Sequence, residues 1–143
     1  MDKINKLGKL VFLLEKHEKN LHQKAIQCKA RLDEEQRKYD LLKGCLDDYR
    51  EKLKANNLSI QSFRYQHYQT FFQQLENAIL QQTDVVARTK AVHQKWLKDI
   101  EMAKKKLESM HKLIAGEKAY IQHKMDKKEM QMATDLFNRI NKR

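Results

Sequence analysis

The sequence of 143 residues contains no proline, three glycines and a single tryptophan. Proline breaks or kinks a helix and glycine weakens one, so their scarcity leaves long stretches in which nothing interrupts helix formation. Charged residues make up 34% of the chain and hydrophobic residues 41%. This composition is typical of long helices rather than of a globular core.

Long hydrophobic runs are missing as well. No segment approaches the about 20 apolar residues that a membrane-spanning helix needs. The run at Leu10–Leu14 has only five residues, which is too short for the apolar region of a secretory signal. We therefore expect a cytoplasmic protein that does not insert into the membrane.

Cysteine is scarce, and its placement excludes an internal disulfide. Cys28 and Cys45 are seventeen residues apart on one expected helix, which separates them by roughly 25 Å. A reducing compartment fits this placement, and we interpret both cysteines as small apolar residues.

The sequence also lacks the spacings that catalytic sites use. None of the six histidines is paired with another at i,i+4, and no Cys-x-x-Cys, glycine-rich phosphate loop or Gly-x-Ser-x-Gly occurs. The adjacent carboxylates Asp47 and Asp48 lie outside the apolar pattern and are interpreted as solvated surface. We therefore predict no enzymatic activity, no metal site and no cofactor.

What the sequence does contain is a heptad repeat, in two runs on either side of a short polar break at Ala55–Ser62. The first run is apolar except at Glu18 and Glu35, and the second except at Gln82, Thr89, His93 and Glu117. Such a repeat, held over seven or eight heptads, is the signature of a coiled coil. The seam positions of the first run are Leu7, Val11, Leu14, Leu21, Ala25, Cys28, Leu32, Tyr39, Leu42, Leu46, Tyr49 and Leu53. Those of the second are Tyr68, Phe72, Leu75, Ile79, Val86, Trp96, Ile100, Ala103, Leu107, Met110, Ile114 and Ile121.

The expected fold is all-α, with two long helices forming an antiparallel coiled-coil hairpin in a single domain. We predict helices at about 2–55 and 63–141, a turn at about 56–62, and Ser62 as N-cap of the second helix. Pairing residues whose numbers sum to 121 places Tyr49 opposite Phe72 and Leu46 opposite Leu75. In this register the polar seam residues fall into mixed layers in the middle of the pair, where they fix the register at some cost in stability.

The second helix is longer than the first in this register, and residues from about 117 onwards form an overhang. Gly116 precedes it, and we expect a weak point there because glycine costs a helix about 1 kcal/mol relative to alanine. The overhang stays amphipathic, and an unpaired amphipathic helix needs a surface to lie against. Its apolar residues are Ile121, Met125, Met132, Leu136 and Ile140.

Charge and aromatic residues are distributed unevenly along the chain, whose net charge is +11. The basic excess belongs to the end that carries both termini, including Lys104, Lys105, Lys106 and Lys124, Lys127, Lys128. The neighbourhood of the turn is nearly neutral and carries Phe63, Tyr65, Phe71 and Leu80 off the seam. Exposed aromatic residues are enriched at interfaces, although these could also cover the turn itself. Lysine clusters can bind phosphate, but on a coiled coil they more often serve solvation.

The aromatic region carries a family resemblance. The run Tyr68-Gln69-x-Phe71-x-Gln73-x-Leu75-Glu76-x-Ala78-Ile79, together with Leu46-x-x-Tyr49-Arg50, resembles the FliJ family of the flagellar type III export apparatus. Trp96 and the stretch Asp126-Lys127-Lys128 are similar in placement, and so are the length and the hairpin layout.

The resemblance implies a stalk that enters the hexameric ring of the flagellar export ATPase and promotes its assembly. It further implies a link to the cytoplasmic domain of the export-gate membrane protein and an escort role for export chaperones, in the cytoplasm at the inner membrane. By position, the gate-binding residues are Leu42, Cys45, Tyr49, Phe71, Leu75, Ala78 and Gln82. Cys45 stands where the family has an aromatic residue, and Lys38 where it has an uncharged polar one.

We assign the aromatic end to the gate and the basic end to the ATPase ring. The ring-binding residues are then Lys104, Lys105, Lys106, Lys124, Lys127 and Lys128. Two other readings remain open from the residues alone: a coiled-coil scaffold or chaperone with unrelated partners, and a basic coiled coil that binds nucleic acid or anionic membrane.

Overall fold

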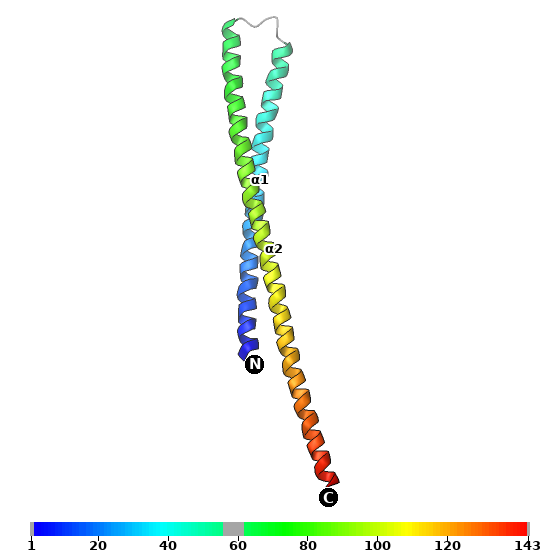
Figure 1. The fold of residues 1–143 in the computed structure, drawn as a ribbon. Coiled ribbons are helices and arrows are strands. Elements are labelled where there is room, and N and C mark those ends of the chain that lie inside the picture. The colour runs from blue at the N-terminus through cyan, green and yellow to red at the C-terminus, as the bar shows by residue number, and fades with distance from the viewer. Residues whose placement is uncertain (1, 56–61, 143) are drawn as a thin grey trace. The chain divides into compact units, whose positions relative to one another are not determined.

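The computed structural model describes residues 2–55 and 62–142. Helix α1 spans Asp2–Ala55 and helix α2 spans Ser62–Asn141 (Figure 1). The described residues contain no strand. Most of the expected turn at 56–62 lies outside the described residues, and so do the side chains of Ser62, Phe63 and Tyr65.

The chain divides into two compact units, and both helices contribute to each. Residues 1–20 and 100–143 form what we call the terminal unit, and residues 21–99 form the turn unit. In the turn unit the helices are antiparallel, since Cys28, Glu35 and Arg50 on α1 contact Thr89, Gln82 and Glu76 on α2. The predicted all-α fold of two long antiparallel helices is confirmed.

In the turn unit the heptad positions form the interface between the helices. Leu46 is 5% exposed and Leu75 is 8% exposed. The other seam residues of this unit are all buried or half-buried. The ring centroids of Tyr49 and Phe72 are 6.3 Å apart, as the proposed register predicts. Polar residues interrupt the seam midway, where Thr89 is buried and the Cys28 thiol donates to its backbone carbonyl at 3.8 Å.

In the terminal unit the same repeat continues. Val11, Ala103 and Leu107 are buried, and Ile4 and Ile114 are half-buried. The ammonium of Lys3 lies 3.5 Å from the carboxylate of Glu117, so the first turn of α1 is level with Glu117 on α2. The apolar seam therefore extends to the N-terminal first turn of α1.

Beyond this point α2 has no partner helix. Ile121 is half-buried, and every described residue from 122 to 142 is exposed. The predicted overhang is confirmed. The weak point expected at Gly116 does not interrupt the helix, because α2 is continuous there and no glycine has a positive φ.

Candidate functional site

An aromatic cluster lies on the turn unit, where α1 and α2 each contribute side chains. The ring of Phe71 packs 4.6 Å from that of Tyr49, and it also contacts Phe72 at 6.5 Å. Phe71 is 37% exposed although it belongs to this cluster. A shallow hollow of about 400 Å³ is lined by Tyr49, His67, Tyr68 and Phe71. The cluster therefore presents aromatic surface that a partner can contact.

The residues expected to bind the export gate differ in their accessibility. Cys45 and Phe71 are exposed, whereas Leu75 is buried in the seam. Cys45, Phe71 and Ala78 each directly precede a seam residue, and such positions of two antiparallel helices face each other along one edge. We call this the aromatic edge: Leu42, Cys45, Tyr49, Phe71, Ala78 and Gln82, all exposed or half-buried.

Gln82 also has a structural task within the seam. Its amide nitrogen donates to the backbone carbonyl of Glu35 at 2.9 Å and to the Glu35 carboxylate at 2.6 Å. The hydrogen bond from Gln82 holds the pKa of Glu35 below its ordinary value of 4.5. Partial burial opposes this shift, and Lys38, at 3.5 Å, adds to it. Glu35 is therefore kept ionised inside the seam.

The lysines expected to bind the ATPase ring all belong to the terminal unit. Residues 104–106 are three consecutive exposed lysines, and Lys105 has a weak ion pair with Glu101 at 3.7 Å. On the overhang, Lys124 lies over the ring of Tyr120, at 5.5 Å from its centroid. The terminal unit holds 16 basic against 9 acidic residues, and the turn unit 14 against 10. Most of the positive charge therefore resides in the terminal unit.

The overhang does not continue the coiled-coil seam. Past Ile121 the next five seam positions are polar, and the apolar stripe moves to neighbouring positions. The stripe is also wider than a seam, because Met130 and Phe137 extend it around the helix. The polar seam positions are Lys124, Lys128, Gln131, Asp135 and Asn138. A helix with this pattern suits a broad apolar surface rather than a second coiled-coil strand.

A shallow hollow on the overhang combines apolar and cationic side chains. Its volume is about 530 Å³, and its lining includes Ile121 and Met125 beside Lys124, Lys127 and Lys128. These three lysines are among those expected to contact the ATPase. The overhang therefore joins positive charge to apolar surface, which suits an acidic partner with an apolar surface of its own.

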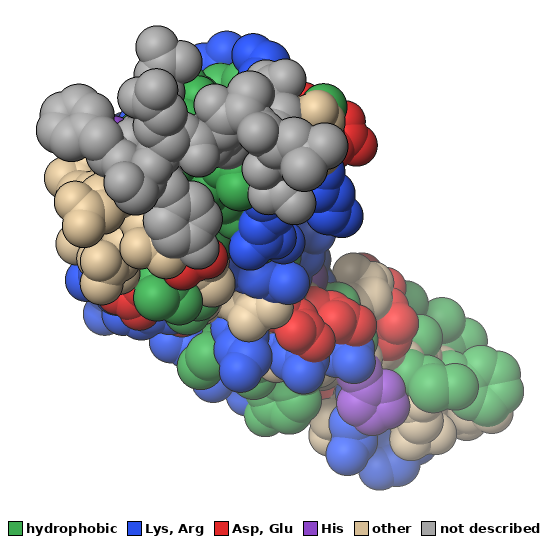
Figure 2. All heavy atoms as spheres, turned by 90° about the horizontal axis from the view of Figure 1, so that it is seen from above, with side chains coloured by type: hydrophobic (Ala, Val, Ile, Leu, Met, Phe, Trp, Pro, Cys, Tyr) green, Lys and Arg blue, Asp and Glu red, His purple; other side chains and the backbone are tan. Residues whose placement is uncertain are grey.

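Exposed apolar side chains are frequent in the terminal unit. Leu10, Phe12 and Leu13 are exposed on α1, and Leu113 and Tyr120 on α2. Figure 2 shows apolar side chains at the surface among lysine and arginine side chains. The signal for this surface was the run Leu10–Leu14, since five consecutive apolar residues exceed what a single seam can bury.

Within residues 2–55 and 62–142, no group of three or more histidine, cysteine or acidic side chains could hold a metal ion. Neither described helix contains a segment that is long and apolar enough to cross a bilayer.

A sequence model of the family described as flagellar FliJ protein matches residues 3–139. No curated protein and no solved structure matches the chain significantly. The match covers both helices and includes the aromatic edge, the lysines of the terminal unit and most of the overhang. The chain therefore belongs to the FliJ family, which makes it a component of the flagellar export apparatus.

Proposed function

We propose that this protein is a non-enzymatic stalk of the flagellar export ATPase complex. It enters the hexameric ATPase ring, promotes ring assembly and ATP hydrolysis, and links the ring to the cytoplasmic domain of the export-gate membrane protein. It acts in the cytoplasm, peripheral to the inner membrane, and escorts export chaperones there. Family membership supports the general role, and the distribution of surface chemistry supports the particular one.

The observation that carries the proposal is that the two units expose different chemistry. The turn unit presents the aromatic edge and a small charge excess, which suits a largely apolar contact. The terminal unit presents an excess of lysine and arginine together with exposed apolar side chains. A linker between two proteins needs two such surfaces. We assign the aromatic edge to the export gate and the terminal unit to the ATPase ring.

The experiment that tests this function measures ATP hydrolysis by the cognate export ATPase with and without the protein. Size-exclusion chromatography of the same mixtures reports the size of the ATPase assembly. We expect faster turnover and a shift of the ATPase towards a hexamer-sized complex that contains the protein. If neither the rate nor the assembly changes while circular dichroism shows an intact helical protein, the stalk role is wrong and a general scaffold role replaces it.

A further inference from the structure

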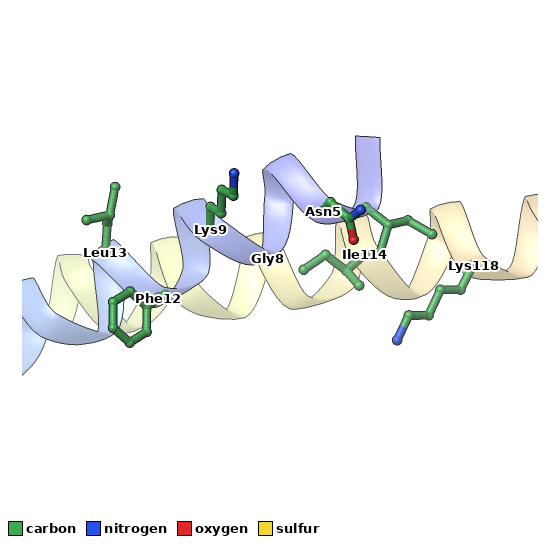
Figure 3. Close-up of a pocket in the computed structure, with 8 residues that line it drawn as sticks. Asn5, Gly8, Lys9, Phe12, Leu13, Ile114 and Lys118 are labelled. Atoms are coloured by element: carbon green, nitrogen blue, oxygen red, sulfur yellow. The ribbon is translucent and has the colours of Figure 1, made fainter. Parts of the chain in front are cut away.

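A second hollow in the terminal unit lies over Gly8. Its volume is about 850 Å³, and its walls come from both helices. Figure 3 shows Phe12 and Lys118 pointing to one side of it and Lys9 and Leu13 to the other, with Gly8 on the helix between them. The hollow shares no residue with the aromatic edge or with the lysines assigned to the ATPase ring.

Gly8, which has no side chain, lines this hollow. Ile4 and Phe12 lie one helical turn before and after it, and a Cβ added to Gly8 would meet nothing within 4 Å. Gly8 has no positive φ, so its backbone conformation does not require glycine. Glycine nevertheless costs a helix about 1 kcal/mol relative to alanine. An empty position between side chains one turn apart has the form of a hole that receives the knob of another helix.

Residues 10–14 of α1 are five consecutive apolar residues, so this stretch of the helix is apolar on every face. α2 covers Val11 and part of Leu14, whereas Leu10, Phe12 and Leu13 are 47%, 56% and 61% exposed. A helix that is hydrophobic all round is normally enclosed, and exposed apolar clusters mark interaction surfaces. Leu10, Phe12 and Leu13 therefore offer a contact surface at this level of α1.

The charges around the hollow indicate what covers it. Lys9 and Lys118 line the hollow, and none of the lining residues is acidic. The ammonium of Lys16 lies 5.1 Å from the centroid of the Phe12 ring, which brings a third cation to this wall. An apolar floor with cationic walls is complementary to a helix that has a bulky apolar stripe flanked by carboxylates.

We propose that the hollow over Gly8 is a docking site for an acidic amphipathic helix of a partner protein. A large apolar side chain of that helix enters the space over Gly8 and packs against Ile4, Phe12 and Ile114. Its carboxylates face Lys9 and Lys118. The hollow lies in the unit assigned to the ATPase ring, but none of its lining residues is among the lysines given that role. The proposal therefore holds whether or not the protein stimulates an ATPase.

The test fills the hollow without damaging the helix. Gly8→Leu places a side chain where open space allows it, and leucine favours the helix more than glycine does. Gly44→Leu is the matched control, because Gly44 is also exposed with nothing within 4 Å of an added Cβ but lies in the turn unit. The probe is a fluorescent synthetic helix of about three heptads, with leucine at the seam positions and glutamate on the flanks.

We expect the full-length protein to bind the probe and Gly8→Leu to weaken binding about tenfold or more. Gly44→Leu should bind like the wild type, and both variants should be at least as stable as the wild type in thermal unfolding. Lys9→Glu combined with Lys118→Glu should weaken binding and make it less sensitive to salt.

Four results would each overturn the proposal. The first is that the probe does not bind, and the second is that Gly8→Leu and Gly44→Leu bind it equally well. The third is equal binding of a probe with lysine in place of glutamate, which would leave a purely apolar contact. The fourth is that the hollow binds something other than an acidic helix. In that case the wild type, but not Gly8→Leu, would bind vesicles of phosphatidylglycerol or would self-associate in light scattering.

Discussion

The amide of Gln82 on α2 donates two hydrogen bonds to Glu35 on α1, at 2.9 Å to the backbone carbonyl and at 2.6 Å to the carboxylate. This contact joins the two helices at the middle of the turn unit. It also gives a charged side chain a partner inside an otherwise apolar seam. A lone carboxylate there would oppose helix pairing, whereas the bonded one favours the register that aligns it with Gln82.

The first prediction concerns the pH dependence of stability. The pKa of Glu35 lies below its ordinary value of 4.5 in the folded protein, chiefly because Gln82 donates to the carboxylate. The resulting stabilisation is complete above the ordinary pKa and is lost as the pH falls through the lowered folded value. In Gln82→Leu this contribution is smaller, because the largest cause of the lowered pKa is gone and burial is then opposed only by Lys38 and Arg31.

The measurement is thermal unfolding of both proteins between pH 7 and pH 3, with carboxylate NMR of Glu35. The difference in Tm between wild type and Gln82→Leu should move in favour of the variant as the pH falls below about 4.5. The packing gain from leucine does not depend on pH and cancels in this comparison. Gln36→Leu is the control, because Gln36 donates to the exposed Asp40 at 3.1 Å, away from the seam. A pH-independent difference for Gln82→Leu would contradict the prediction.

The second prediction separates the seam from the surface. Leu46→Ala should lower the free energy of unfolding by about 2–4 kcal/mol, because Leu46 is 5% exposed and its removal leaves a cavity between the helices. Leu41→Ala should cost less than about 1 kcal/mol, because Leu41 is 65% exposed. Urea unfolding followed by circular dichroism measures both. Equal costs for the two substitutions would show that Leu46 does not lie in the interface.

The seam could be predicted from the sequence because burial in a coiled coil follows a fixed repeat. Residues such as Leu46, Leu75 and Ile100 are buried where the heptads place them. The repeat does not specify which neighbouring layer a polar side chain reaches. The register placed Gln82 opposite Tyr39 and Glu35 opposite Val86, whereas the amide of Gln82 extends one turn along the seam to Glu35.

The surface was harder to predict, for a related physical reason. A surplus of apolar residues can be counted from composition, but its location depends on which faces the partner helix leaves uncovered. The sequence directed attention to Phe71 and Leu80 near the turn, and both are exposed. Exposed apolar side chains are nevertheless more numerous in the terminal unit within the described part of the chain, from Leu10 to Ile140. The hollow over Gly8 depends on the neighbours of a missing side chain, which only the structure supplies.

The third prediction concerns the aromatic edge. Phe71→Ala should weaken binding to the cytoplasmic domain of the export gate by about 1–2 kcal/mol, because aromatic residues that are partly exposed in the free protein often dominate an interface. The matched control is Leu80→Ala, since Leu80 is 68% exposed and lies outside the edge. Isothermal titration calorimetry gives the affinities.

Phe71 also packs against Tyr49 at 4.6 Å, and losing such a pair costs about 0.5–1.5 kcal/mol of stability. Circular dichroism at the titration temperature must therefore show both variants equally helical. Leu75→Ala is unsuitable for this test, because Leu75 is buried and its removal would disturb the seam. Unchanged gate affinity of a folded Phe71→Ala protein would remove the aromatic edge from the gate contact.

The fourth prediction concerns the exposed lysines at 104–106. Replacing all three with glutamate should reduce stimulation of the export ATPase several-fold and leave binding to the gate domain unchanged. The control reverses three exposed lysines of the turn unit, Lys29, Lys43 and Lys90, which changes the net charge by the same amount. ATP hydrolysis is measured at two salt concentrations, because a charge-driven effect must fall as the salt rises. Equal loss in both triple variants would indicate a general charge effect rather than a contact at residues 104–106.

The last prediction concerns Gly116, which lies just before the overhang in a continuous stretch of α2. A Cβ there would meet nothing within 4 Å, and the residue has no positive φ. Gly116→Ala should therefore stabilise the helix locally by about 0.5–1 kcal/mol. Because residues 122–142 are exposed, the gain should appear as slower amide hydrogen exchange around Gly116 and beyond it rather than as a large rise in Tm. Stimulation of the ATPase should persist, since the protein already has a continuous helix there. If Gly116→Ala abolished stimulation while protecting the helix, the working form of the overhang would be bent at Gly116.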